Sequence, residues 1–196
     1  MADTIRIDLA DNGRNAVPKT AEERIFGTII DGTRLFINWE AIPEETIPLE
    51  KNLVLKAVSL FRERTGFAGS INIHLNKRIP VGSGLGGASS DAASTLLALN
   101  SLAGADLAMD ELGGMALILG SDSPFFLSGG AAFVSGRGEL IEPVNSPGEL
   151  WAILVMPPFH IDTGSAYRLL DEAREAAPEI AIQSKNMSAI LYTGYS

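Results

Sequence analysis

The stretch that decides the fold is residues 79–93, IPVGSGLGGASSDAA, which carries four glycines, at positions 82, 84, 86 and 87, and two serines, at positions 89 and 90. Glycines let a backbone approach a phosphate closely, and the unpaired N–H groups at the start of a helix attract an anion. A simple turn, with Ser89 or Ser90 as an ordinary helix cap, needs one or two glycines rather than four. The stretch therefore predicts a loop that binds a polyphosphate.

Two well-known phosphate loops share part of this pattern. The P-loop, G-x-x-x-x-G-K-[ST], is absent because no lysine follows the glycines. Residues 82–87 do satisfy the dinucleotide fingerprint G-x-G-x-x-G, and Asp106 follows about 20 residues later, as that fingerprint requires. However, Pro80 interrupts the approach to the first glycine, and Asp106 lies in a polar turn, AGADLAMDE. A dinucleotide oxidoreductase, which would bind NADH in preference to ATP, is thus the weaker alternative.

The sequence around the loop alternates between strand and helix patterns. Ile71, Ile73 and Leu75 alternate with polar residues, which predicts a strand that ends ahead of the glycines. From 52 to 64 apolar residues recur at helical spacing, and Gly66 follows the last turn. Similar patterns predict helices at 88–102, 110–119 and 163–177, and strands at 4–9, 33–39, 130–135 and 151–156. The expected fold class is α+β.

Composition limits the classes of partner. Of the 196 residues 46% are hydrophobic, enough for a sizeable core, and 24 acidic residues against 15 basic ones give a net charge of -9. Nucleic acids and anionic membranes attract clustered Lys and Arg, so neither is an expected partner. The chain has no cysteine, two histidines, and no apolar run near the roughly 20 residues of a membrane span. We expect a cytoplasmic protein with a small-molecule substrate; the sequence predicts no oligomeric state.

Residues 79–93 resemble the second motif of the GHMP kinases, the family of galactokinase, homoserine kinase and mevalonate kinase. Other stretches resemble one branch of that family: DTIRIDL at 3–9, Asn52-Leu53, LGSDSPFF at 119–126, GRGE at 136–139 and the segment at 157–167. The resemblance implies the α+β, two-lobe GHMP-kinase fold, with an N-terminal lobe of a kind also found in a ribosomal protein. It implies a nucleotide-binding domain over residues 1–150 and the start of a C-terminal domain over 151–196.

The resemblance also implies roles for single residues. ATP would donate a phosphoryl group to a hydroxyl of a nucleotide-linked polyol, with Mg²⁺ bridging the phosphates and no metal ligand assigned. Asp122 matches the catalytic base of the family, and Asn52 and Thr163 match positions that contact the nucleotide and the acceptor. Read without the resemblance, Asp122 could equally cap a turn before Pro124, and Asn52 and Thr163 could be helix caps. The expected nucleotide-binding residues are Asn52 and the loop residues Pro80, Val81, Gly82, Ser83, Gly84, Leu85, Gly86, Gly87, Ala88, Ser89 and Ser90.

Further expectations concern the charged side chains near the loop. Asp122 lies between a predicted helix and two aromatic residues, so we expect its carboxylate to be partly desolvated and close to the glycine loop. Lys77 and Arg78 lie just ahead of the loop, where they could steer phosphates, but we expect both to be solvated surface charges.

Two motifs of the family have no counterpart in this sequence. One is an N-terminal strand bearing Pro-Ala-Lys, whose lysine is the usual partner of the catalytic aspartate, and the other is a C-terminal glycine-rich motif. We therefore expect the chain to be truncated at both ends. The alternatives left open are another GHMP kinase acting on mevalonate, homoserine or a sugar, and a nucleotide-binding protein that has lost the chemistry.

Overall fold

A computed structural model describes residues 2–10, 26–39, 48–145, 148, 151, 153–155 and 163–176 of the chain. Strands and helices are mixed along these residues, which confirms the α+β class. In chain order the elements are β1 (Thr4–Ala10), β2 (Phe26–Ile30), β3 (Thr33–Trp39), the short 3-10 helix η1 (Leu49–Lys51), α1 (Leu53–Thr65), β4 (Ser70–Lys77), α2 (Gly87–Leu102), α3 (Met109–Leu119), α4 (Phe125–Ser128), β5 (Ala131–Ser135), β6 (Leu140–Val144) and α5 (Thr163–Ala176).

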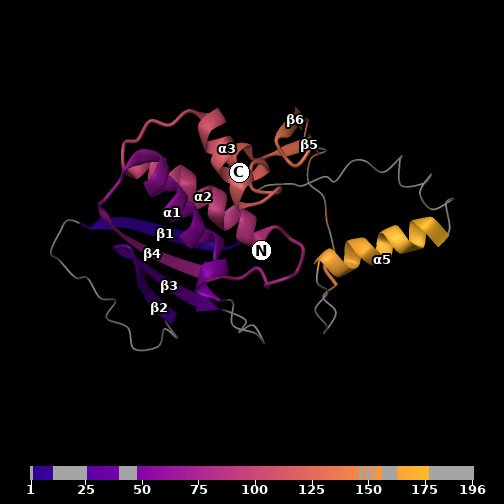
Figure 1. Cartoon of the computed structure of the whole chain (residues 1–196), viewed down its shortest axis with the longest axis horizontal. Helices are drawn as coiled ribbons and strands as arrows, with labels where there is room; N and C mark the ends of the chain where they lie inside the picture. Colours follow the sequence, from indigo (N-terminus) through magenta and orange to yellow (C-terminus); the bar gives the residue numbers. More distant parts are fainter. Residues whose placement is uncertain are drawn as a thin grey trace.

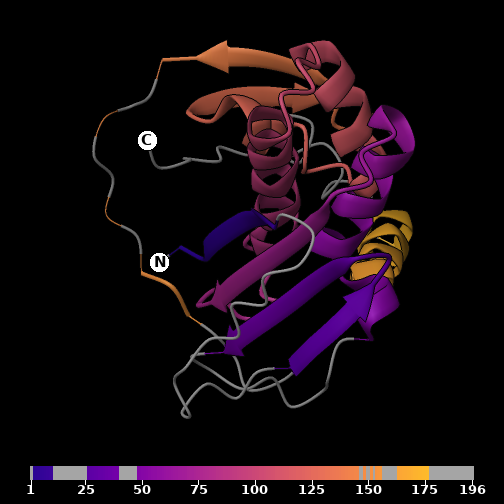
Figure 2. The ribbon, with the colours of Figure 1, turned by 90° about the vertical axis from the view of Figure 1, so that its left-hand side faces the viewer.

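The main sheet has the strand order β1-β4-β3-β2. β3 and β4 are parallel, because α1 connects them as a crossover, whereas β1 with β4 and β2 with β3 are antiparallel. The register places Ile73 between Ile7 and Leu35, so apolar side chains align across three strands. Figure 2 shows the helices gathered on one face of this sheet.

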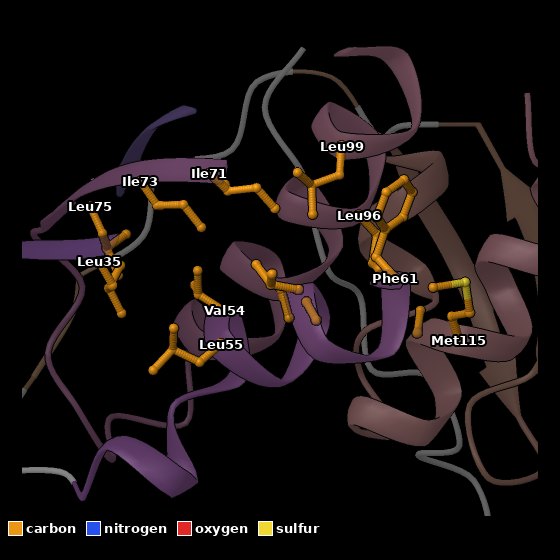
Figure 3. Packing of buried hydrophobic residues seen from close by; sticks show 14 of the residues in the cluster. Leu35, Val54, Leu55, Phe61, Ile71, Ile73, Leu75, Leu96, Leu99 and Met115 are labelled. Atoms are coloured by element: carbon orange, nitrogen blue, oxygen red, sulfur yellow. The ribbon is translucent and has the colours of Figure 1, made fainter. Parts of the chain in front are cut away.

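An apolar core fills the space between the sheet and its helices (Figure 3). Ile73 of β4, Phe61 of α1 and Leu96 of α2 are fully buried in it, and burial of side chains of this size contributes about 1.5–3 kcal/mol each. Other members labelled in Figure 3 are Leu35, Val54, Leu55, Ile71, Leu75, Leu99 and Met115. Because β4 and α2 both pack into this core, the two ends of the glycine loop between them are fixed.

The starts of α1 and α2 differ in how they are capped. Asn52 precedes α1, and its Oδ1 accepts hydrogen bonds from the backbone N–H groups of Val54 (2.9 Å) and Leu55 (3.3 Å). α2 begins at Gly87 after Gly86, which has a φ of 70° and makes no side-chain cap. Its first N–H groups are therefore left without a side-chain acceptor from the cap residue, and neither serine of the loop acts as the helix cap.

The expected elements are mostly confirmed, with four differences. β2, α4 and β6 were not expected; β6 is the edge of a two-stranded sheet and contains Pro143, which weakens the strand pattern. The strand expected at 151–156 is wrong where the structure describes it, since Trp151 and residues 153–155 form no strand. Strand formation needs a neighbour to take its backbone groups, and an apolar pattern cannot supply one.

Figure 1 shows α5 apart from the sheet and from the helices that cover it. Its side chains are mostly exposed, including Tyr167 and Leu169. Residues 177–196, which complete the C-terminal domain expected from 151 onward, lie outside the described residues, so that boundary stays a prediction. Among the helices that the structure describes, none combines the length and the apolar character needed to cross a bilayer.

Candidate functional site

The glycine loop between β4 and α2 has an alternating backbone conformation. Gly82, Gly84 and Gly86 have φ values of 69°, 72° and 70°, in the left-handed region that favours glycine. The residues between them, Ser83 and Leu85, do not have positive φ. Left-handed residues within a turn are one component of the backbone arrangements in which successive N–H groups converge on an anion. The backbone of the loop is therefore suited to hold phosphate groups, and it ends at the start of α2.

The loop forms one wall of a cavity of about 210 Å³. Residues 80–89 all line it, and Asn52 lines it from the start of α1. Four apolar side chains also line the cavity, those of Trp39, Leu53, Val54 and Leu75, and so do three charged residues, Lys51, Lys77 and Asp91. Ser90 is the expected loop residue that does not line the cavity, because its Oγ donates a hydrogen bond to the Gly87 carbonyl at 2.9 Å. The cavity thus combines a backbone suited to phosphate with an apolar wall.

Asn52 has a structural role and a place in the cavity at once. Its Oδ1 is occupied by the cap of α1, whereas its side-chain amide group makes no hydrogen bond within the described part of the chain. An amide N–H₂ group carries two donors. Asn52 can therefore cap α1 and still donate to a ligand in the cavity.

Three charged side chains lie buried beneath the loop, and sequence reasoning missed them as a group. Lys77 donates hydrogen bonds to Asp3 and, at 2.8 Å, to Asp91, the fifth residue of α2. The side chains of Lys77, Asp3 and Asp91 are 6%, 3% and 6% exposed. The expectation that Lys77 is a solvated surface charge is therefore wrong, whereas Arg78 is exposed as expected. Lys77 follows Ile71, Ile73 and Leu75 at every second position of β4, so the alternation places it on the inward face.

Burial raises the pKa of Asp91 from 3.8 to about 6. The hydrogen bond and the charge of Lys77 lower this pKa, and the negative charge of Asp3 raises it, but desolvation has the largest effect. At neutral pH Asp91 is therefore mostly ionised, although its ionised form is disfavoured in the fold.

Asp122 lies in the turn between α3 and α4, beside the start of α2. A Cβ built at Gly120 would lie 3.8 Å from the Ser89 Oγ, and one built at Gly86 would lie 2.8 Å from the ring of Phe126. These contacts place residues 120–126 against the glycine loop, as expected. The expected desolvation of Asp122 is wrong: its side chain is exposed, and among the described residues it makes no ion pair and does not line the cavity.

The turn between β5 and β6 fixes the backbone next to Asp122. Gly138 is buried with a φ of 118°, and a Cβ there would lie 1.8 Å from the carbonyl oxygen of Ser121. A backbone atom cannot move aside as a flexible side chain can, so this position requires glycine. Sequence reasoning assigned no function to Gly138; the glycine pair in GRGE was the signal, but nothing in the sequence shows which backbone it approaches.

Thr163 is the first residue of α5, and its side chain lies outside the described part of the chain. Its expected contact with the acceptor stays a prediction.

With the geometry established, comparison with known proteins assigns the fold. Residues 52–130, which span α1, β4, the glycine loop, α2, α3 and the Asp122 turn, match the family described as the GHMP kinases N terminal domain. Over these residues the chain is similar to a GHMP kinase N-terminal domain. The dinucleotide-binding alternative is thereby displaced, because the G-x-G-x-x-G match lies inside this domain.

Individual relatives agree with this assignment. The chain is 47% identical over 117 residues to the 4-diphosphocytidyl-2-C-methyl-D-erythritol kinase of Shewanella oneidensis, covering 60% of this chain and 41% of that protein. It is 39% identical over 162 residues to the same-named kinase of Symbiobacterium thermophilum, covering 83% and 56%. A crystal structure of 4-(cytidine 5'-diphospho)-2C-methyl-D-erythritol kinase shares the fold with a TM-score of 0.50 and 33% identity, covering 72% of this chain and 41% of that one. The chain thus spans about half the length of these relatives.

Proposed function

We propose that this chain carries the nucleotide-binding domain and the base of an ATP-dependent kinase. Its acceptor is a hydroxyl of 4-diphosphocytidyl-2-C-methyl-D-erythritol, and its reaction belongs to the non-mevalonate route to isoprenoid precursors. The named relatives, which include one 47% identical over 117 residues, support this acceptor over mevalonate, homoserine or a sugar. A cytoplasmic location and the domain boundary at residue 151 remain part of the proposal.

The observation that carries the proposal is the conformation of the glycine loop. Three left-handed glycines alternate with residues whose φ is not positive, immediately before an uncapped helix start, and apolar side chains line the same cavity. Converging N–H groups favour the phosphates of ATP, while Trp39 and its apolar neighbours favour a planar base. A net charge of -9 would otherwise repel ATP, so the attraction must be local, from the backbone donors of the loop and the Lys51 ammonium group that lines the cavity.

The chemistry follows from the position of Asp122 next to the loop. The acceptor oxygen attacks the γ-phosphorus, the bond from that phosphorus to the β,γ-bridging oxygen breaks, and its electron pair leaves with ADP. Asp122 accepts the proton of the attacking hydroxyl. An exposed carboxylate can take up this proton when the acceptor covers it, and the rest of the catalysis is positioning and charge stabilisation.

Magnesium would support the reaction by neutralising the phosphate charge. In the described part of the chain no group of three histidine or acidic side chains could hold a metal ion. Mg²⁺ keeps several waters and is commonly bound through substrate phosphates with one or two protein oxygens. The residues present therefore fit an ion that arrives with ATP, and the hydroxyl groups along the loop are the available protein oxygens.

The test is ADP release from Mg-ATP by this chain, with the cytidylyl substrate, mevalonate or homoserine offered separately. We expect release with the cytidylyl substrate alone and its loss in Asp122→Asn. Asp106→Asn is the matched control, because Asp106 is also an exposed acid and its φ of 51° is one that asparagine tolerates. Release with mevalonate or homoserine instead would contradict the proposed acceptor, and equal loss in both variants would contradict the role of Asp122.

A second candidate is a nucleotide-binding protein without turnover. The observation in its favour is that Asp122 is exposed and has no cationic partner among the described residues. This alternative predicts that Mg-ATP binds, that no acceptor causes ADP release, and that Asp122→Asn binds Mg-ATP as the wild type does.

A further inference from the structure

Both ends of the glycine loop are held by one group of three charged side chains. Asp3 Oδ1 accepts hydrogen bonds from the backbone N–H groups of Arg78 (2.6 Å) and Ile79 (2.8 Å), the last residues before the loop. Asp3 Oδ2 and Asp91 Oδ2 both accept from the Lys77 ammonium group. Asp91 is the fifth residue of α2, the helix that follows the glycines. The ammonium group of Lys77 therefore joins the chain that leads into the loop with the helix that leads out of it.

The space around this link is closely filled. A Cβ built at Gly87 would lie 2.8 Å from Ile79 Cγ2 and 3.4 Å from Asp3 Oδ2, so the first residue of α2 packs directly against the start of the loop. Lys77 and Asp91 also line the cavity in which the loop forms a wall. A shift of either carboxylate would therefore move backbone that faces the bound ligand.

The link is not explained by stability. Two carboxylates and one ammonium group are buried together, and such a group of charges commonly adds nothing to stability over apolar residues of similar size. The raised pKa of Asp91, caused mainly by desolvation, shows that its ionised form carries a cost in the fold. A buried arrangement of this kind at a loop that binds phosphate is more simply explained by what it does to the loop.

We propose that Asp3, Lys77 and Asp91 are positioning residues for the nucleotide: their bonds hold the two ends of the glycine loop at the separation at which its N–H groups converge on the phosphates. This inference rests on the proposed function of the loop. None of the three side chains need touch the nucleotide, because each acts through the backbone at residues 78–79 or through the N-terminal part of α2.

The experiment measures the Kd of Mg-ATP by calorimetry in the double variant Lys77→Met/Asp91→Leu. Lys77→Met alone would leave two buried carboxylates without their cation, whereas the double variant removes a positive and a negative charge together and keeps similar volume. Lys56→Met is the matched control, because Lys56 is exposed and does not line the cavity. Urea unfolding and amide hydrogen exchange of the unliganded loop accompany each titration.

We expect Mg-ATP to bind about tenfold more weakly to the double variant, with faster exchange at residues 80–90, since two charge-assisted hydrogen bonds that set the loop are gone. The folded double variant should also unfold at lower urea, because Asp3 stays buried without its cation. The control should match the wild type in all three measurements. Asp3→Asn, which keeps an oxygen for the N–H groups of Arg78 and Ile79, should lose less affinity than the double variant.

Unchanged affinity and unchanged loop exchange in the double variant would overturn the positioning role while leaving the proposed kinase intact. A loss of stability without a loss of affinity in the folded protein would overturn it as well, because that is the result of a purely structural ion pair. Failure of the wild type itself to bind Mg-ATP is a different result: it would refute the proposed function and this inference together.

Discussion

The glycine loop and the Asp122 turn meet at the first turn of α2, but different interactions hold them. Buried charges fix the loop, with Lys77 bonded to Asp3 and Asp91. Close backbone contacts fix the turn, chiefly Gly138 against the carbonyl of Ser121, and its acid is exposed. The glycine loop, which binds the nucleotide in the proposal, is thus held by Lys77 and Asp91 next to it and by Asp3 near the N-terminus. The turn that carries Asp122, the proposed base, instead depends on the β5–β6 hairpin that follows it in sequence.

The largest expected effect comes from Gly138→Ala, which tests whether the hairpin holds the Asp122 turn. The new Cβ would overlap the Ser121 carbonyl oxygen, so we expect a loss of about 3 kcal/mol in the free energy of unfolding. In the folded protein, ADP release should fall while the Kd of Mg-ATP changes little. Gly114→Ala, where α3 leaves open space for a Cβ, is the control and should not destabilise. If the two variants behave alike, the turn is not held by this contact.

The next effect concerns the pH dependence of stability at the loop. The folded pKa of Asp91, about 6, exceeds its ordinary 3.8, so the folded state binds this proton more tightly and stability from this group falls as pH rises through that interval. Asp91→Asn removes the dependence. The unfolding free energy of the variant minus that of the wild type, measured in urea, should increase by about 2 kcal/mol from pH 4.5 to pH 7.5. A difference that stays constant with pH would show that Asp91 is not buried as described.

A similar effect is expected at Gly86, where loop and turn touch. Alanine at this φ of 70° costs about 1 kcal/mol, and displacement of the Phe126 ring adds about as much again. Gly84→Ala shares the positive φ but meets no atom within 4 Å, so it isolates the contact. Urea unfolding should therefore show Gly86→Ala to be less stable than Gly84→Ala. Equal stabilities would mean that Phe126 does not join the two regions.

The smallest effect is at the cap of α1. Asn52→Ala should lose about 1 kcal/mol of stability, because the N–H groups of Val54 and Leu55 lose their acceptor. Asn52→Asp keeps the acceptor and should keep the stability, but it adds a negative charge to the cavity and should weaken Mg-ATP binding. Should both variants retain wild-type affinity, Asn52 would be a cap and nothing more.

Much of the fold could be predicted from the sequence because local patterns determine it. The helix after Asn52, the strand through Ile73 and the helix after the glycines follow from periodicity and punctuation, and the structure confirms them. The prediction of a strand at 151–156 was wrong because the pattern gives apolar character without a pairing partner. β2 and β6 were missed for the converse reason: their pairing with a neighbour, rather than their own composition, makes them strands.

In the candidate site, too, features with a local sequence signal could be predicted and contacts between distant residues could not. Residues 80–90 were predicted to bind phosphate, because glycines and a helix start carry a local signal, and the structure places residues 80–89 along the cavity. The burial of Lys77 was available from the alternation in β4, but the charge itself suggested a surface position. Its bond to Asp3, and the contact of Gly138 with Ser121, join residues distant in sequence. A single sequence carries no sign of such contacts.

The most direct test of the account compares affinity and rate in one variant, Asp122→Asn, in the presence of the cytidylyl substrate. We predict that the Kd of Mg-ATP is unchanged, because Asp122 does not line the cavity, while phosphoryl transfer falls by about a hundredfold or more, as expected for loss of a general base. Transfer at the wild-type rate, or a loss of affinity that accounts for the whole fall in rate, would contradict the separation of binding at the glycine loop from chemistry at Asp122.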